Sequence, residues 1–259
     1  MQAPRILPVV TDHRARPRPR TTEDRKLLMR QPVADTSFLE SDAWRALRIM
    51  GEFIEGFDAL ARLGPAVSIF GSARTRRSDP MYEEARSLAA RLSEEGFTVI
   101  TGGGPGIMEA ANRGAKEAEG ISVGLGIDLP HEQGVNEYVD LPAYFRYFFV
   151  RKTMFVKYAQ AFVIFPGGFG TFDELFESLT LVQTGKIDHF PIILYGSHYW
   201  AGLLEWLRST VAEAGMVDED DLDLVRVCDD VEEVVSIIAE AYSVRGDTDI
   251  RKPHGEEVA

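Results

Sequence analysis

AFVIFPGGFGTFDELFESLTLV, residues 161–182, decides the fold. Its first five residues form a short apolar run that is typical of a buried strand, and its last eight have the spacing of an amphipathic helix. Between them Gly167, Gly168 and Gly170 let backbone N–H groups approach an anion closely, and the helix start adds further N–H groups and a partial positive charge. We expect Glu174 in the first helical turn, beside the bound group. The stretch predicts a site for a phosphorylated small molecule with a carboxylate next to it.

Outside this stretch, apolar and amphipathic segments alternate along the chain. The alternation predicts right-handed βαβ units, and hence an α/β, Rossmann-like three-layer fold with a mainly parallel sheet. A single catalytic domain is expected over residues 39–245, between a basic tail at 1–38 and a polar tail at 246–259. The predicted strands are 66–70, 97–101, 121–126, 161–165, 191–195 and 224–228. The predicted helices are 41–63, 80–95, 107–119, 142–160, 170–184, 200–214 and 231–242.

The net charge of −13 argues against general nucleic-acid binding. Residues 1–30 run against this trend, with eight basic and three acidic side chains. A disordered, solvated tail explains such a segment, and an arm that binds an anion or a partner is the alternative. No apolar run approaches the roughly 20 residues of a membrane helix, and no secretory signal is visible. Because Cys228 is also the only cysteine, we expect a cytoplasmic protein.

Three glycine-bearing loops follow predicted strands, at Gly71-Ser72, 102–106 and 167–171. In a parallel sheet such loops lie at the carboxyl edge, and they form one crevice where the strand order reverses between two of them. Neither glycine cluster completes G-x-G-x-x-G, because Ile107 and Asp173 stand at the third glycine position, and no G-x-x-x-x-G-K-[ST] is present. Short loops of this kind favour a single phosphate over a dinucleotide or a triphosphate. Tight turns that only connect elements are the alternative.

Arg151 and Glu174 are the charged candidates for a site. Arg151 lies in an apolar helical stretch, where a guanidinium should seek a carboxylate or a phosphate, although an arginine on a helix is commonly solvated. Glu174 has a competing interpretation, because Thr171-x-x-Glu174 is a capping-box pattern that serves the helix alone. The five histidines show no H-x-x-x-H spacing. We therefore expect no metal site, and the family resemblance of the residues described next implies that no organic cofactor is required either.

Residues 166–174, with Arg151-Lys-x-x-Met154 upstream, resemble the signature pair of the Lonely Guy family. Residues 102–112, GGGPGIMEAAN, resemble its second glycine loop, and the likeness covers roughly residues 65–215. The resemblance implies a homodimer or a larger homo-oligomer. It also implies hydrolysis of the N-glycosidic bond of a nucleoside 5′-monophosphate, AMP or an N6-modified AMP, to a free base and ribose 5-phosphate.

The resemblance also assigns residues. Arg151 and Glu174 match the catalytic pair, in which the carboxylate stabilises the positive charge that develops on the ribose and orients water. Val150 stands where short plant-type members have a polar residue, and with the N-terminal extension it is similar to a longer bacterial subgroup. The positions that match substrate contacts are Ser72, Gly103, Gly104, Glu132, Lys152, Met154, Gly167, Gly168, Phe169, Gly170, Thr171, Asp173 and Thr180.

Two other functions stay open. A non-catalytic nucleotide-binding or carrier protein would use the same fold. The label lysine decarboxylase, which many relatives carry, would require a pyridoxal phosphate Schiff base, and Lys152 is the only lysine near the motifs.

Overall fold

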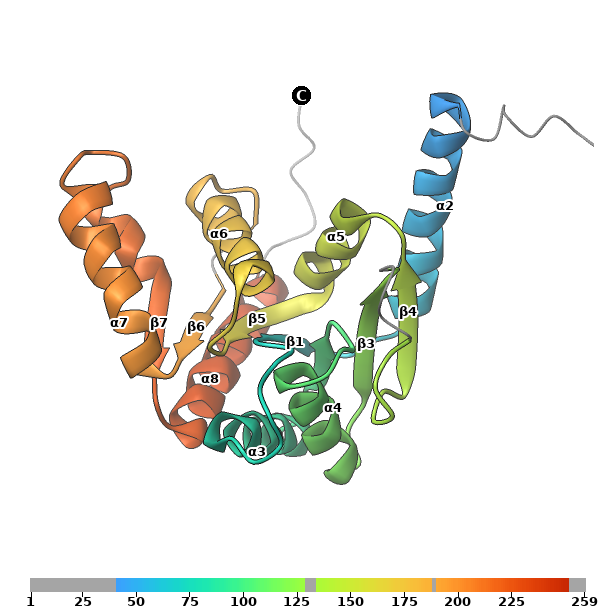
Figure 1. Cartoon of the computed structure of the whole chain (residues 1–259), viewed down its shortest axis with the longest axis horizontal. Helices are drawn as coiled ribbons and strands as arrows, with labels where there is room; N and C mark the ends of the chain where they lie inside the picture. The colour runs from blue at the N-terminus through green and yellow to red at the C-terminus, as the bar shows by residue number, and fades with distance from the viewer. Residues whose placement is uncertain (1–40, 129–133, 188–189, 252–259) are drawn as a thin grey trace, which may run out of the picture. The chain divides into compact units, whose positions relative to one another are not determined.

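Parallel strands form one seven-stranded sheet in the order β4-β3-β2-β1-β5-β6-β7 (Figure 1). The structure, a computed structural model, describes residues 41–128, 134–187 and 190–251. The chain divides into two units after Arg45, and the second unit contains the whole sheet. The predicted α/β fold with a mainly parallel sheet is confirmed. The strands are β1 (Ala66–Phe70), β2 (Thr98–Thr101), β3 (Ser122–Ile127), β4 (Leu141–Phe145), β5 (Ala159–Ile164), β6 (Ile192–Tyr195) and β7 (Val225–Cys228).

Helices cover both faces of the sheet (Figure 1). One apolar cluster joins the first face to α3, α4 and α8, and a second joins the other face to α2, α5, α6 and α7. The side chains of the central strands β1 and β2 are buried throughout, as expected for a parallel sheet covered on both sides. The helices are α2 (Asp42–Leu60), α3 (Pro80–Glu94), α4 (Ile107–Glu117), α5 (Phe148–Tyr158), α6 (Phe169–Gln183), α7 (Ser197–Trp206), which continues into a π-helical turn (Leu207–Ala212), a 3-10 helix (Glu219–Leu224) and α8 (Val231–Arg251).

The strand order reverses between β1 and β5, which lie side by side in the middle of the sheet. The chain leaves β1 toward α3 on one face and leaves β5 toward α6 on the opposite face. The Phe165 N–H donates to the carbonyl of Phe70 at 2.8 Å, so the two strands end together. The two connections diverge from this point, and a crevice opens at the carboxyl edge of the sheet as such folds require.

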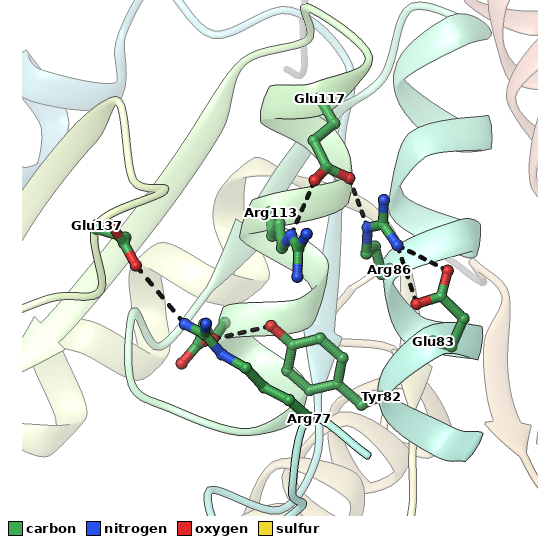
Figure 2. Close-up of polar contacts among 8 residues, drawn as sticks. Arg77, Tyr82, Glu83, Arg86, Arg113, Glu117 and Glu137 are labelled. Atoms are coloured by element: carbon green, nitrogen blue, oxygen red, sulfur yellow. Dashed lines mark hydrogen bonds and ion pairs between the residues drawn. The ribbon is translucent and has the colours of Figure 1, made fainter. Parts of the chain in front are cut away.

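Ion pairs tie α3 to α4 on the outer surface (Figure 2). Glu117 of α4 accepts from Arg86 of α3 and, at 2.8 Å, from Arg113 of its own helix. Arg77, in the connection between β1 and α3, reaches Glu109 of α4 at 2.6 Å. These contacts hold the connection that leads away from the crevice against the neighbouring helix.

The prediction of helix over 142–160 is wrong in its first part. Residues Leu141–Phe145 form β4, the edge strand next to β3, and the helix α5 begins only at Phe148. In β4 the buried side chains, Ala143 and Phe145, alternate with more exposed ones, which is the period of a strand. Pro142 is tolerated because the strand lies at the edge of the sheet.

The chain ends also differ from the prediction. The helix α8 continues to Arg251, beyond the predicted end at residue 242 and into the segment expected as a polar tail. The basic tail at 1–38 and residues 252–259 lie outside the described residues.

Candidate active site

A cavity of about 820 Å³ lies at the point where the strand order reverses. Residues of all three predicted glycine loops line it, together with side chains from α5 and α6. The expectation that two of these loops flank a switch point and share one crevice is confirmed for those that follow β1 and β5. The predicted site residues on its wall are Ser72, Gly104, Arg151, Gly167, Gly168, Phe169, Gly170, Thr171 and Glu174.

Backbone hydrogen bonds join the three loops into one wall. The Ser72 N–H donates to the carbonyl of Pro166 at 3.0 Å, and the Ser72 carbonyl accepts from the Ile107 N–H at 3.1 Å. Gly106, at φ +70°, makes the second bond possible, because a Cβ there would overlap the Ser72 carbonyl oxygen. A glycine is therefore required where the second loop passes the first.

A buried amide network supports the loop after β2. Asn112 of α4 accepts from the Thr101 hydroxyl at 2.6 Å and from Asn136 at 2.9 Å. The Asn136 amide also donates to the carbonyls of Gly103 and Gly104, at 3.1 and 3.0 Å. These bonds fix the loop from below, on the side away from the cavity. Sequence reasoning quoted Asn112 in a motif but did not foresee this network.

Helix α6 begins earlier than predicted, and this changes the position of Glu174. The N-cap is Gly168, whose carbonyl accepts from the N–H groups of Thr171 and Phe172. Glu174 is therefore the sixth helical residue, in the second turn, and the predicted capping box does not form because the cap carries no side chain. The expectation of Glu174 in the first turn is wrong, and so is its interpretation as a capping residue. Phe169 and Gly170 line the cavity, and their N–H groups precede the first intrahelical bond.

Glu174 is a buried carboxylate, with 5% of its surface exposed. Burial raises the pKa of Glu174 to about 7, against the opposing effect of the positive charges of Lys152 and Arg151. Its Oε2 atom accepts no hydrogen bond from any described residue, and the Lys152 Nζ lies 3.8 Å away. Such a group is suited to exchange protons near neutral pH.

Arg151 reaches the same cavity from α5. Its guanidinium lies 5.3 Å from the ring centre of Phe148 and 5.6 Å from that of Phe155, and Nη1 lies 3.5 Å from the carbonyl oxygen of Leu125. Aromatic faces favour a cation at such distances. The cavity wall therefore presents a fixed positive charge from one helix and a titratable carboxylate from another.

Several predicted residues lie away from the cavity wall. Lys152 is paired with carboxylates of α6, and Asp173 belongs to that pairing. Met154 is fully buried and packs against Gly56 of α2. Thr180 is exposed, and its hydroxyl donates to the carbonyl of Phe176 at 2.7 Å.

Gly103 adopts φ +72° and packs against Val135, beneath the loop instead of facing the cavity. Glu132 lies outside the described residues.

Tyr199 is a site residue that sequence reasoning missed. It comes from α7, lines the cavity and donates its hydroxyl to the carbonyl of Gly167 at 2.5 Å. The signal was present, because Tyr199 follows the predicted strand at 191–195, whose carboxyl end lies at the same edge of the sheet.

Among residues 41–128, 134–187 and 190–251, no group of three or more histidine, cysteine, aspartate or glutamate side chains is placed to hold a metal ion. In the same ranges, every helix is too short or too polar to span a lipid bilayer.

The fold and the cavity define a parallel α/β protein whose candidate ligand site lies at the switch point of its sheet. The chain belongs to the family described as possible lysine decarboxylase, whose model matches residues 108–238, just over half of the chain. This result confirms the resemblance found in the sequence.

Similar proteins in this family carry nucleotide-hydrolase names. The cytokinin riboside 5′-monophosphate phosphoribohydrolase of Mycobacterium marinum is 28% identical over 161 residues, which cover 61% of this chain and 86% of that protein. The enzyme of the same name from Mycobacterium tuberculosis is 26% identical over 67% of this chain and 92% of its own length. The pyrimidine/purine nucleotide 5′-monophosphate nucleosidase of Escherichia coli is 30% identical over 51% of this chain and 32% of its own.

A solved structure shares the fold. The molybdenum cofactor binding protein of Rippkaea orientalis matches 70% of this chain and 99% of its own, with a TM-score of 0.50 and 21% identity. At this identity the likeness concerns the fold alone.

Proposed function

We propose that this protein hydrolyses the N-glycosidic bond of a nucleoside 5′-monophosphate, AMP or an N6-modified AMP, to a free base and ribose 5-phosphate. The observation that carries the proposal is the common cavity, which Arg151, the buried carboxylate of Glu174 and the N-terminus of α6 all face. The names of the mycobacterial and Escherichia coli relatives support it.

The N-terminus of α6 is the proposed phosphate site. Phe169 and Gly170, whose N–H groups precede the first intrahelical bond, line the cavity, and the helix adds its partial positive charge there. Nothing lies within 4 Å of the Cβ positions of Gly168 and Gly170, which leaves room for an anion against the backbone. Binding a phosphate at this point fixes the ribose relative to Glu174.

Glu174 is the proposed group that acts on the ribose. When the C1′–N bond breaks, its electron pair leaves with the base and positive charge develops at C1′. An ionised Glu174 stabilises that charge and orients the attacking water. Water supplies hydroxide to C1′ and a proton to the base, so the products are a free base and ribose 5-phosphate.

Arg151 is the proposed residue for the base side of the cavity. Its guanidinium is held between the rings of Phe148 and Phe155, and Phe148 and Met108 offer apolar surface on the same wall. A fixed cation there stabilises negative charge on the departing base, directly or through water.

The geometry disfavours lysine decarboxylation. A Schiff-base lysine must lose its proton to attack a carbonyl group. Burial opposes the charge of Lys152, but its hydrogen bond to Glu177 and the charge of Glu174 outweigh burial and hold the pKa of Lys152 above its ordinary value. An ammonium group engaged in this way is a poor nucleophile.

We also propose a homodimer formed through α2. Leu47, Met50, Ile54 and Phe57 are exposed apolar side chains at spacings of three and four residues, which is the pattern of a helix-pairing seam. Gly51, in the middle, has nothing within 4 Å of its Cβ position, so a second helix can approach closely.

Light scattering after size exclusion tests the dimer. We expect twice the monomer mass for the wild type and the monomer mass for Ile54→Asp. Ile121→Asp, at an exposed position just before β3, serves as the matched control. A dimer that survives Ile54→Asp would show that α2 is not the interface.

We further propose a cytoplasmic location, which the single buried thiol of Cys228 supports.

The activity is tested by incubating the protein with AMP and with N6-isopentenyl AMP and following the free base by chromatography. We expect base release by the wild type and by Glu240→Gln, an exposed control on α8, and none by Glu174→Gln. The ratio of the two rates identifies the preferred base. A folded wild type that binds either nucleotide and releases no base would contradict the proposal and favour a carrier.

A further inference from the structure

Lys152 of α5 lies among three carboxylates of α6. Its Nζ is 2.6 Å from Glu177 Oε2, 3.1 Å from Asp173 Oδ2 and 3.8 Å from Glu174 Oε2. The first distance is that of a hydrogen bond from Lys152 to Glu177, the second that of an ion pair, and the third is beyond hydrogen-bond range. Of these residues only Glu174 lines the cavity, so Lys152 acts on the site through Glu174.

We propose that Lys152 is a positioning residue that favours the ionised form of Glu174 without bonding to it, and that Glu177 and Asp173 hold the ammonium group at that distance. The proposal rests on the proposed function, in which Glu174 must be a carboxylate with an oxygen available to the substrate. It gives Lys152 and Asp173 a role other than the substrate contacts that the resemblance implied.

The site must satisfy two opposing requirements. A carboxylate with 5% of its surface exposed loses most of its hydration, and without a nearby cation it would take up a proton at neutral pH. A cation in direct contact would instead occupy the oxygen that has to face the ribose. At 3.8 Å, with its shorter contacts directed to Glu177 and Asp173, the ammonium group supplies the charge, and the buried Oε2 accepts no hydrogen bond from any described residue.

Charges from both neighbouring helices act on Glu174. Arg151 and Lys152 of α5 favour its ionised form, whereas Asp173 and Glu177 of α6 oppose it. The acidic pair therefore has two effects, because it opposes ionisation directly and restrains the lysine that favours it. The pKa of about 7 for Glu174 reflects this balance on top of burial.

Substitutions of Lys152 and of Glu177 should change the pH dependence of base release in opposite directions. Lys152→Met removes a positive charge 3.8 Å from Glu174, so the acidic limb of the kcat/KM profile should move up by about 1–3 pH units. Glu177→Gln removes a negative charge and loosens the lysine, which can then approach Glu174. The limb should move to lower pH, and kcat should fall by roughly tenfold to a hundredfold because the lysine then occupies a carboxylate oxygen that must act on the substrate.

Controls separate these effects from a general loss of charge or stability. Lys186→Met and Glu205→Gln make the same changes of charge at exposed positions near the end of α6 and on α7, and both should keep the wild-type profile. Lys152→Arg, which retains the positive charge, should keep the acidic limb closer to the wild-type position than Lys152→Met does.

A direct titration makes the test independent of turnover. The carboxyl carbon of Glu174, labelled with ¹³C and assigned by its disappearance in Glu174→Gln, reports ionisation by NMR in the wild type and in Glu177→Gln. A Glu174 midpoint that does not move, or that moves upward, in Glu177→Gln would overturn the proposal even if Lys152→Met failed to fold. If the wild type released no base but the Glu174 midpoint still shifted as expected in the variants, the proposed reaction would be wrong and the proposed role of Lys152 would stand.

Discussion

Replacing Glu174 by glutamine should make the protein more stable as well as inactive. The pKa of Glu174 rises from 4.5 to about 7 on folding, with burial as the main cause. Since 1 pKa unit corresponds to 1.36 kcal/mol, the ionised form costs about 3 kcal/mol of folding free energy. A group whose pKa is raised in the folded state destabilises the protein as pH rises from the unfolded pKa through the folded one. The cost is therefore complete near pH 8 and falls to about 1 kcal/mol at pH 5.

The assay is urea unfolding of wild type and Glu174→Gln at pH 5 and pH 8. A neutral amide of nearly the same shape removes the cost of ionisation, so the variant should be more stable by about 3 kcal/mol at pH 8, and the gain should shrink at pH 5. Glu240→Gln, on the exposed side of α8, should change stability by less than about 0.5 kcal/mol at either pH. A Glu174→Gln variant that is less stable at pH 8, or whose gain does not depend on pH, would refute the reasoning.

Three further substitutions test the construction of the site. Gly167→Ala should lower the free energy of unfolding by about 1–3 kcal/mol and abolish most of the base release, because its methyl group would overlap the buried side chain of Thr171. The control is Gly170→Ala, whose methyl group meets open space and which should keep the wild-type Tm in the same calorimetric scan. Asn112→Ala should lower the free energy of unfolding by about 2 kcal/mol or more, since buried donors and acceptors lose their partners; a cost below about 0.5 kcal/mol in urea would show that the amide network does not support the loop. Glu117→Gln, in the surface network of Figure 2, should lower the free energy of unfolding by less than about 1 kcal/mol because its ion-pair partners are partly exposed. A loss of stability that is the same in 1 M salt would contradict this expectation.

The sequence predicted the features that depend on local pattern. The run 161–165, the glycines after it and the helix that follows are contiguous, so their order alone indicates a strand, a turn and a helix, and the structure confirms them. Strand β4 was missed because its identity depends on pairing with β3. In isolation the segment LPAYF resembles the start of the apolar helix that follows it.

The remaining site features depend on how separate elements pack together. Thr101, Asn112 and Asn136 form one network, yet they are spread over more than thirty residues with no spacing rule that joins them. The contacts of Lys152 likewise could not be predicted from the sequence, because its partners depend on the placement of α5 beside α6. A motif can mark such a residue as important, but its partners are fixed by tertiary packing.

The position of Glu174 shows why the helix start matters for function. Had the helix begun at Thr171, as a capping box requires, Glu174 would have bonded back to the cap and remained near the surface. Two glycines before Thr171 allow α6 to begin at Phe169 instead, which moves Glu174 one turn into the helix. In the structure the helix N-terminus lines the same cavity as the loop after β1, as a candidate anion site, and the Glu174 carboxylate is buried. A single change in helix start therefore yields both the candidate phosphate site and the raised pKa of Glu174, so that a substitution which shifts the start should alter both together.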